Sequence, residues 1–371
     1  MTIAGSNASG GDGTHSMDLT DFDIIDAHMH QWDPHGTPRE FSKLARLMRY
    51  LPLPVDIASK LAPRADREFV GDPTAYLHPY LPADYRADRG GSPVESVVHI
   101  EVQWAGWQPD ETRWVASLPF GVDTPALACI VGSADPSAAD FGAVLDAHQS
   151  ASPLFHGVRS MVAHHPDRGV KSFAAHDGVL TSPAFLNGFG QLAQRGLSYD
   201  AWVYSGQLPE VTALAERFPE VPIVLDHLGT PAGIFGPVGK DTGHTARQRE
   251  VLFHRWRDDL TDLAAQPNVV AKVSGLMMPV LGHPVPPRGM VTPVPELISR
   301  VGPLLAHALA VFGADRLIWG SNFPIDKPIT SLGGAVEAVA TGLSDAGADR
   351  DDLRKVFGGN AARVYRIDTA D

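Results

Sequence analysis

Two histidines near the N-terminus, His28 and His30, stand two residues apart in a short apolar run. Alternate residues of a β-strand face the same side, so in a strand both imidazoles project together with Asp26. Neutral imidazole is the commonest metal ligand in proteins, and the pair could bind an ion or polarise a substrate carbonyl. An H-x-H pattern alone is weak evidence, because a chance pair on a solvated strand end explains it nearly as well.

A third imidazole and a carboxamide follow the ends of two later apolar runs. His227 lies just before Gly229, and Asn322 follows Trp319. The ordinary alternatives are a locally satisfied polar residue for His227 and a turn-forming amide for Asn322. If the runs are strands of one barrel, both side chains lie at the same end as His28 and His30.

Polar residues on a second apolar run could supply an acid or a base. Glu101 and Gln103 share one predicted strand face with His99, and burying such groups is unfavourable unless they are used. A solvated strand end explains Glu101 equally well. Asp326 lies four residues after Asn322 and could reach back to it, or it could form a surface ion pair with Lys327.

Three further residues are candidates for contacting the substrate. Arg159 suits a substrate carboxylate, which a guanidinium holds with two parallel hydrogen bonds, but an ion pair with a loop acid is equally favoured. Lys272 could stabilise a developing oxyanion or serve as the partner of inward-facing acids. Tyr204 is expected to line the pocket, whereas Trp202 is expected to fill the core.

Eight apolar runs, each followed by a helical pattern, must position these residues. They are Asp23–His30, Ser96–Gln103, Ala126–Ser133, His156–Val162, Leu197–Tyr204, Pro222–Gly229, Val269–Leu276 and Arg316–Asn322. Alternating strands and helices predict a parallel sheet, and eight units predict a (β/α)8 TIM barrel of the α/β class. A doubly wound sheet is the main alternative, but no G-x-G-x-x-G follows the first strand.

Three long segments exceed what a minimal barrel needs. They are Trp32–Pro93, which includes a predicted helix over Arg39–Tyr50, then Thr230–Arg247 and Met277–Pro295. Each follows a strand and would therefore rise from the C-terminal face of the barrel, where TIM-barrel active sites lie. We expect these segments to act as lids over the site, the alternative being disorder.

Composition narrows the function further. The chain has 371 residues, one cysteine and a net charge of −13. We expect a disordered leader over residues 1–20, one barrel domain over 21–371, and a reducing cytoplasm as location. Without a basic stripe or an apolar run long enough to span a membrane, neither nucleic acid nor membrane is an expected partner. The expected partner is an acidic small-molecule substrate, and a homo-oligomer remains compatible with the sequence.

Five ordered motifs give the chain a specific resemblance. They are Ile25–His30, Leu225–Gly229, Lys272–Gly275, Trp319–Pro324 and Gly359–Tyr365. The chain resembles the second amidohydrolase family, which includes sugar-acid lactonases, pyrone-dicarboxylate lactonases and related decarboxylases. This resemblance, over about Asp23–Ile367, implies that His28, His30 and His227 surround one divalent ion, zinc first, or the substrate carbonyl directly without a metal. Phe155–Val162 contains no lysine, and the resemblance therefore implies one metal at most.

Asn322 departs from the family pattern, which places a water-activating aspartate there. A carboxamide cannot take a proton from water. The first hypothesis is therefore a lactone or activated-carbonyl hydrolase with its base elsewhere, at Glu101 or Asp326. The second is a decarboxylase of an unsaturated or aromatic acid, and the third is a barrel that binds a ligand without catalysis.

Overall fold

Eight parallel strands form one sheet in sequence order in the computed structural model, which describes residues 19–50 and 62–368. Met29 pairs with Phe323 in a parallel bridge, and the backbone amide of Asn322 donates to the carbonyl of His28 at 2.7 Å. These contacts join the last strand to the first, so the chain is a (β/α)8 TIM barrel, as the sequence predicts. The strands are β1 (Ile24–Met29), β2 (Val94–Ile100), β3 (Ala126–Ser133), β4 (Phe155–Arg159), β5 (Ser198–Ala201), β6 (Ile223–Leu225), β7 (Val269–Val273) and β8 (Leu317–Trp319).

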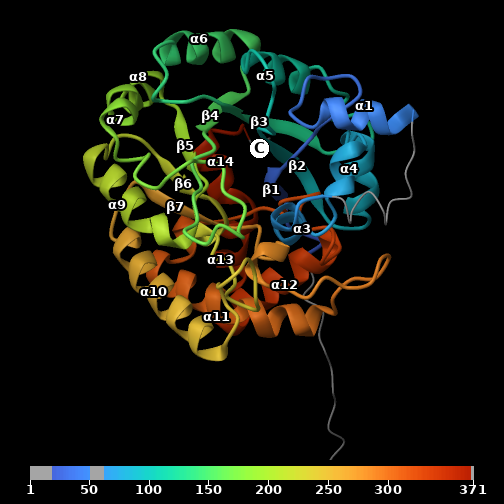
Figure 1. Cartoon of the computed structure of the whole chain (residues 1–371), viewed down its shortest axis with the longest axis vertical. Helices are drawn as coiled ribbons and strands as arrows, with labels where there is room; N and C mark the ends of the chain where they lie inside the picture. The colour runs from blue at the N-terminus through green and yellow to red at the C-terminus, as the bar shows by residue number, and fades with distance from the viewer. Residues whose placement is uncertain (1–18, 51–61, 369–371) are drawn as a thin grey trace, which may run out of the picture.

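Helices surround the strands on the outside of the barrel (Figure 1). Several begin at a capping side chain: Ser331 accepts a hydrogen bond from the backbone amide of Gly334, and Thr245 and Gln248 form a reciprocal capping box. These caps satisfy backbone amides that have no partner within a helix. The helices are α1 (Ser42–Tyr50), α3 (Arg64–Val70), α4 (Pro82–Arg89), α5 (Pro109–Ala116), α6 (Phe141–Ala151), α7 (Pro183–Phe189), α8 (Gln191–Arg195), α9 (Leu208–Arg217), α10 (Ala246–Ala264), α11 (Val294–Phe312), α12 (Leu332–Asp345), α13 (Arg350–Arg354) and α14 (Asn360–Tyr365).

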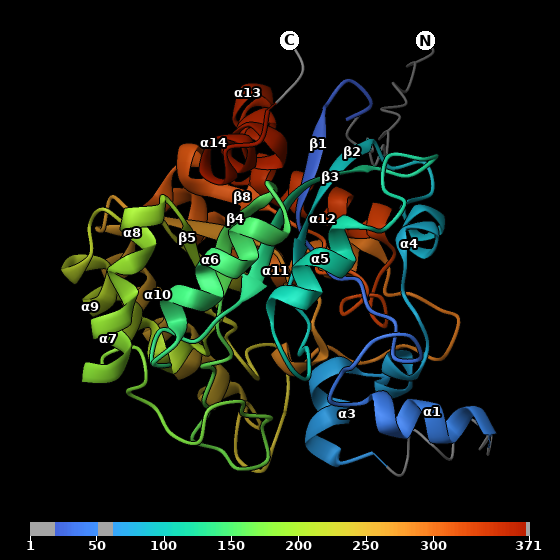
Figure 2. The same ribbon diagram turned by 90° about the horizontal axis from the view of Figure 1, so that it is seen from above.

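The interior of the barrel has an apolar core separate from the one between strands and helices. Alternate strand residues such as Val98, Val224 and Ile318 build it, together with Ala361 and Tyr365 of α14. Figure 2 shows α13 and α14 at one end of the barrel, opposite α1 and α3. The C-terminal helix therefore fills the N-terminal end of the barrel, and polar strand residues gather at the other end.

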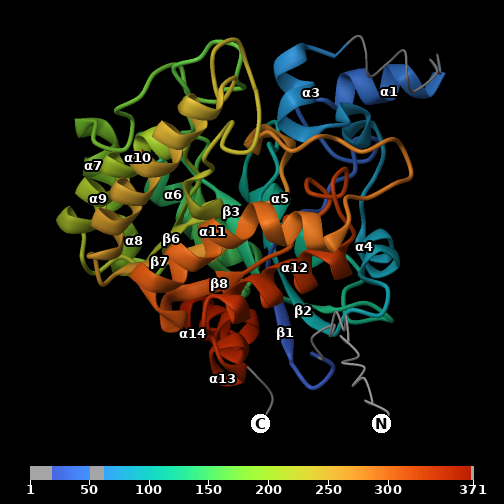
Figure 3. The ribbon, with the colours of Figure 1, turned by 90° about the horizontal axis from the view of Figure 1, so that it is seen from below.

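The long segment after β1 forms much of the opposite end, where α1 and α3 lie (Figure 3). The helix predicted over Arg39–Tyr50 begins at Ser42, whereas α3 and α4 were not predicted. The predicted leader falls on residues 1–18, outside the described part of the chain, and on the next two residues. Of those two, Leu19 is buried in the core.

Among the described helices, α11 alone is long and apolar enough to be considered as a membrane span. Its buried residues include Leu297, Val301, Leu304 and Ala308, which recur at helical spacing. This amphipathic pattern is typical of an outer helix that packs one face on a barrel.

Candidate active site

A cavity of about 700 Å³ opens at the C-terminal ends of the strands. Its polar lining contains six of the residues proposed from the sequence: His30, Glu101, Gln103, Arg159, His227 and Asn322. TIM-barrel enzymes carry their active sites at this end. The cavity is therefore the candidate active site, and we call the six polar residues its floor.

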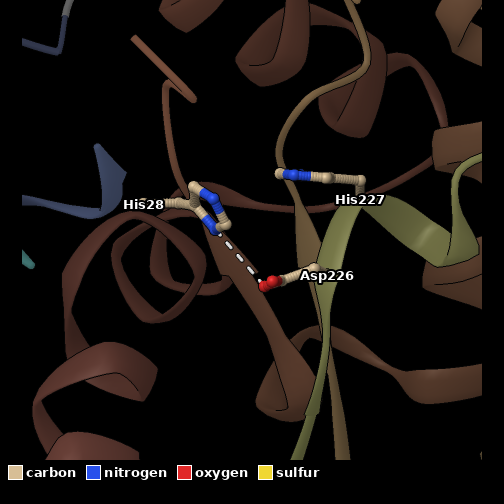
Figure 4. A group of neighbouring side chains, drawn as sticks. All are labelled: His28, Asp226 and His227. Atoms are coloured by element: carbon tan, nitrogen blue, oxygen red, sulfur yellow. Dashed lines mark ion pairs between the residues drawn. The ribbon is translucent and has the colours of Figure 1, made fainter. Parts of the chain in front are cut away.

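His28 lies beneath this floor and forms a potential metal-binding group with Asp226 and His227, in which one ligand atom from each residue lies within 4.8 Å of the others. Figure 4 shows the His28 and His227 rings side by side and the carboxylate of Asp226 below them, with a dashed line marking its ion pair with His28. The Nε2 atom of His28 is buried and has no hydrogen-bond partner among the residues that the structure describes. Two imidazoles and a carboxylate suit a zinc ion, so these donors fit the metal that the family resemblance implies.

His30 is not in that group, because its contacts lead elsewhere. Its Nδ1 donates to the carbonyl of Ile100 at 2.9 Å, and its Nε2 lies 3.3 Å from Oδ1 of Asn322. Burial and the nearby Arg159 lower the pKa of His30 to about 3. The imidazole is therefore neutral at physiological pH.

Asn322 connects His30 to Asp326, which is buried behind the floor. Its Nδ2 donates to Oδ1 of Asp326 at 2.8 Å, and burial raises the pKa of Asp326 to about 8. The Asp326 carboxyl is therefore mostly protonated at neutral pH. His30 carries its proton on Nδ1, so its Nε2 can only accept a hydrogen bond. If the oxygen and nitrogen of the Asn322 carboxamide exchange places, Asn322 donates to Nε2 of His30 and accepts from the protonated Asp326.

A left-handed turn brings His227 to the floor. Consecutive strand residues point to opposite sides, but β6 ends before Asp226, and His227 has a φ of +56°. Both side chains can therefore face the barrel interior. Gly275 leaves room for the ring, since a Cβ there would lie 2.4 Å from Nδ1 of His227, and Ser274 Oγ lies 2.9 Å from the same nitrogen.

Lys272 lies below the floor in a buried ionic cluster. Its Nζ is 2.5 Å from Asp200, 3.2 Å from Asp226 and 3.3 Å from Nδ1 of His28. Burial opposes ionisation of Asp226, but Lys272 and His28 hold its pKa well below the usual value. The sequence left two roles open for Lys272, and these contacts support the role of a partner for the inward-facing acids Asp200 and Asp226.

Arg159 forms the ion pair that the sequence analysis weighed against substrate binding. Its Nε donates to Oε1 of Glu101 at 2.8 Å, and its Nη2 donates to the Glu101 carbonyl at 2.7 Å. The remaining terminal nitrogen lies 3.7 Å from Asp226. Most of the guanidinium is engaged within the protein, and the expected two-bond grip on a substrate carboxylate has no geometric support.

Some predicted neighbours are separated in the structure. Asp26 does not line the cavity, and its carboxylate accepts hydrogen bonds from the backbone amide of His28, from Tyr85 of α4 and from the amide of Ser321. The pairing register of β1 shifts between Asp26 and Met29, which breaks the alternation assumed from the sequence. His99 likewise contacts Glu111 of α5 and not the floor.

Tyr204 and Trp202 exchange the places expected from the sequence. Tyr204 is buried, donates to the carbonyl of Lys171 at 2.6 Å and is absent from the cavity lining, whereas Trp202 does line the cavity. The sequence analysis missed Asp200 and Asp226 as partners of Lys272. Val224 faces the barrel interior, and because alternate strand residues share a face, Asp226 could have been predicted to face the interior as well.

The barrel fold and the site together are typical of an enzyme in which polar residues at the strand ends surround one cavity. A family model described as amidohydrolase matches residues 25–367. The chain belongs to the amidohydrolase family and is an amidohydrolase-type hydrolase. An uncharacterised protein of Sinorhizobium fredii, y4mH, is 32% identical over 94% of this chain and all of that protein. An L-fucono-1,5-lactonase of Burkholderia ambifaria is 30% identical over 70% of this chain and 77% of that protein.

Solved structures share the fold. An amidohydrolase from Burkholderia multivorans with bound zinc matches with a TM-score of 0.66 and 22% identity, covering 93% of this chain and 99% of that one. The 5-carboxyvanillate decarboxylase of Sphingomonas paucimobilis matches with a TM-score of 0.52 and 15% identity, covering 94% of this chain and all of that one. At these identities the likeness shows the barrel and not the reaction.

Proposed function

We propose that the protein hydrolyses a lactone or a similar activated carbonyl compound. The observation that carries this proposal is the floor, where the neutral imidazoles of His30 and His227 adjoin the Arg159–Glu101 pair. Preorganised donors facing a developing oxyanion are among the strongest sources of transition-state stabilisation. The lactonase relative from Burkholderia ambifaria supports the same reaction class.

Glu101 is the carboxylate best placed to serve as the base. Three carboxylates line the cavity among the described residues; Glu40 is exposed, and Asp66 belongs to α3, outside the floor. Glu101 is 1% exposed and belongs to the floor. We propose that Glu101 takes the proton of the attacking water, and that the ring nitrogen of His227 that does not face Ser274 is oriented toward the carbonyl oxygen.

The reaction adds one water molecule to the substrate. The water oxygen bonds to the carbonyl carbon, the acyl carbon–oxygen bond of the ring breaks, and the departing ring oxygen receives a proton. The product of a lactone is a hydroxy acid. One divalent ion, zinc first, would be held by His28, Asp226 and His227, and when bound it would polarise a carbonyl as a Lewis acid.

A panel of lactones with product analysis tests the proposal. We expect Glu101→Gln and His227→Ala to lower kcat by roughly 10²- to 10⁴-fold, the usual contribution of acid–base groups. Glu250→Gln, at an exposed position of α10, is the matched control and should be unaffected. Full turnover by both site variants would contradict the proposal.

The alternative function is decarboxylation on the same scaffold. The observation that favours it is Asn322, because a carboxamide at this position cannot activate water whereas loss of CO2 requires no activated water. The structural likeness to a decarboxylase is compatible with it. Release of CO2 from carboxylated aromatic compounds, with no lactone opened, would decide for this reaction. A ligand recovered unchanged would favour the non-catalytic barrel.

A further inference from the structure

Above its floor, the cavity has predominantly apolar walls. Phe69, Met161, Phe173, Trp202 and Met278 belong to these walls. Binding sites use a few polar groups to orient a ligand and apolar surface for most of their contact. Here six polar residues form the floor, a few others such as Asp66 and Lys171 lie elsewhere in the lining, and a ligand whose carbonyl reaches the floor places most of its remainder against hydrocarbon.

Three aromatic rings from separate parts of the chain form one rigid part of this wall. The ring centroids of Phe173 and Trp202 are 4.8 Å apart, and Phe69 of α3 lies 5.5 Å from Phe173 and 5.7 Å from Trp202. All three pairs meet edge to face, the arrangement that aromatic rings prefer. Mutual packing therefore fixes the rings, and the wall is formed before a ligand binds.

Two leucines of α1 extend the apolar lining toward solvent. Leu44 and Leu47 line the cavity, yet each is 55% exposed. They are three residues apart and so lie on one side of the helix. A ligand that reaches this part of the cavity would remove both side chains from water, which favours an apolar ligand by roughly 25 cal/mol for each Å² buried.

Charge near the cavity disfavours an acidic ligand. Asp66 and the exposed Glu40 add carboxylates to the lining. The two cations that line the cavity among the described residues are already paired, Lys171 with Asp66 and Arg159 with Glu101. A ligand carboxylate would have to compete with these internal partners. The lining therefore favours a neutral ligand.

We infer that the substrate is a neutral lactone with an alkyl or aryl substituent, and not a polyhydroxylated sugar lactone; this inference rests on the proposed function. A hydroxyl of a sugar lactone that faces Phe69, Phe173 or Trp202 would lose its water without gaining a partner, which is unfavourable. A volume of about 700 Å³ leaves room for a substituent beyond the lactone ring. Hydrolysis opens the ring as described above, and the substituent takes no part in the chemistry.

Calorimetric titration of the full-length protein with δ-lactams tests the inference without turnover. Lactams keep the ring carbonyl but resist hydrolysis, and a series with lengthening alkyl chains is compared with a polyhydroxylated δ-lactam. We expect Kd to fall about fourfold for each added methylene until the apolar end is filled. The hydroxylated lactam should bind at least tenfold more weakly than the alkyl members. Equal or tighter binding of the hydroxylated lactam would overturn the inference.

A double variant locates the binding site of the substituent. Replacing Leu44→Gln and Leu47→Gln should weaken the long-chain lactam about tenfold and leave the unsubstituted lactam unchanged. Met290→Gln is the control, because Met290 is 62% exposed and lies outside the cavity lining. Equal loss for short and long lactams would contradict the proposed orientation.

Turnover of the matching lactones separates the two proposals. If sugar lactones are opened faster than alkyl lactones, the proposed function stands and the inferred substrate class fails. If alkyl lactams bind as expected but no lactone is opened, the cavity's preference stands and the proposed hydrolysis fails.

Discussion

Replacing Lys272 by methionine would test the buried cluster beneath the active site. The Lys272 side chain and those of Asp200 and Asp226 are fully buried, with Nζ at 2.5 and 3.2 Å from the two carboxylates. Removing one partner of a buried ion pair leaves an uncompensated charge and typically costs about 3–5 kcal/mol. Since proteins are stable by roughly 5–15 kcal/mol, we expect Lys272→Met to lose a large part of its free energy of unfolding.

The loss should depend on pH. With Lys272 present, burial still raises the pKa of Asp200 to about 6, and removing the ammonium would raise it further. A carboxyl whose pKa is higher in the folded than in the unfolded state destabilises the fold as pH rises. The stability difference between wild type and Lys272→Met should therefore grow from pH 5.5 to pH 8.

Urea unfolding followed by circular dichroism at both pH values measures this difference. Lys355→Met removes an exposed lysine that pairs with Asp315 and Asp352, and it should leave the unfolding midpoint unchanged. Adding Asp200→Asn to Lys272→Met should recover part of the loss, since it removes one unpaired carboxylate. A loss below about 1 kcal/mol, or one equal at both pH values, would refute the reasoning.

Three further predictions concern the residues around the floor. Burial raises the pKa of Asp326 to about 8. The folded protein therefore keeps a proton on Asp326 that the unfolded chain releases near pH 4. Between pH 4 and pH 8 this difference lowers the free energy of unfolding by about 1.4 kcal/mol for each pH unit. Asp326→Asn should remove that slope, and unfolding curves of wild type and variant that stay parallel from pH 5.5 to 7.5 would contradict the assignment. Gly275→Ala should displace His227 and lower turnover at least tenfold, since a Cβ would lie 2.4 Å from the ring; Gly347→Ala, at φ +104° with open space around it, controls for backbone strain alone. Zinc should raise the melting temperature of the wild type by binding the folded state, and Asp226→Asn should reduce the shift; an equal shift in both proteins would argue against the proposed donors.

The predicted boundaries show how far local patterns reach. Ala126–Ser133 matches β3 at both ends, but Pro222–Gly229 and Val269–Leu276 run several residues past β6 and β7. The residues beyond the last paired position, such as Asp226, His227 and Ser274, are still buried at the barrel end. A sequence pattern reports burial, whereas the end of a strand depends on pairing with its neighbour.

By itself, the sequence determined the eight-unit barrel and the end of it at which His30, His227 and Asn322 meet, because strand order and alternation follow from local periodicity. Only the tertiary structure decided the partners of those residues. Tyr85 and Ser321, far from Asp26 in the sequence, take up its carboxylate, and a left-handed turn lets Asp226 and His227 serve one site. Arg159 contacts Glu101, 58 residues earlier in the chain. Such choices depend on distances across the barrel, and side-chain charge and spacing along the chain do not fix them.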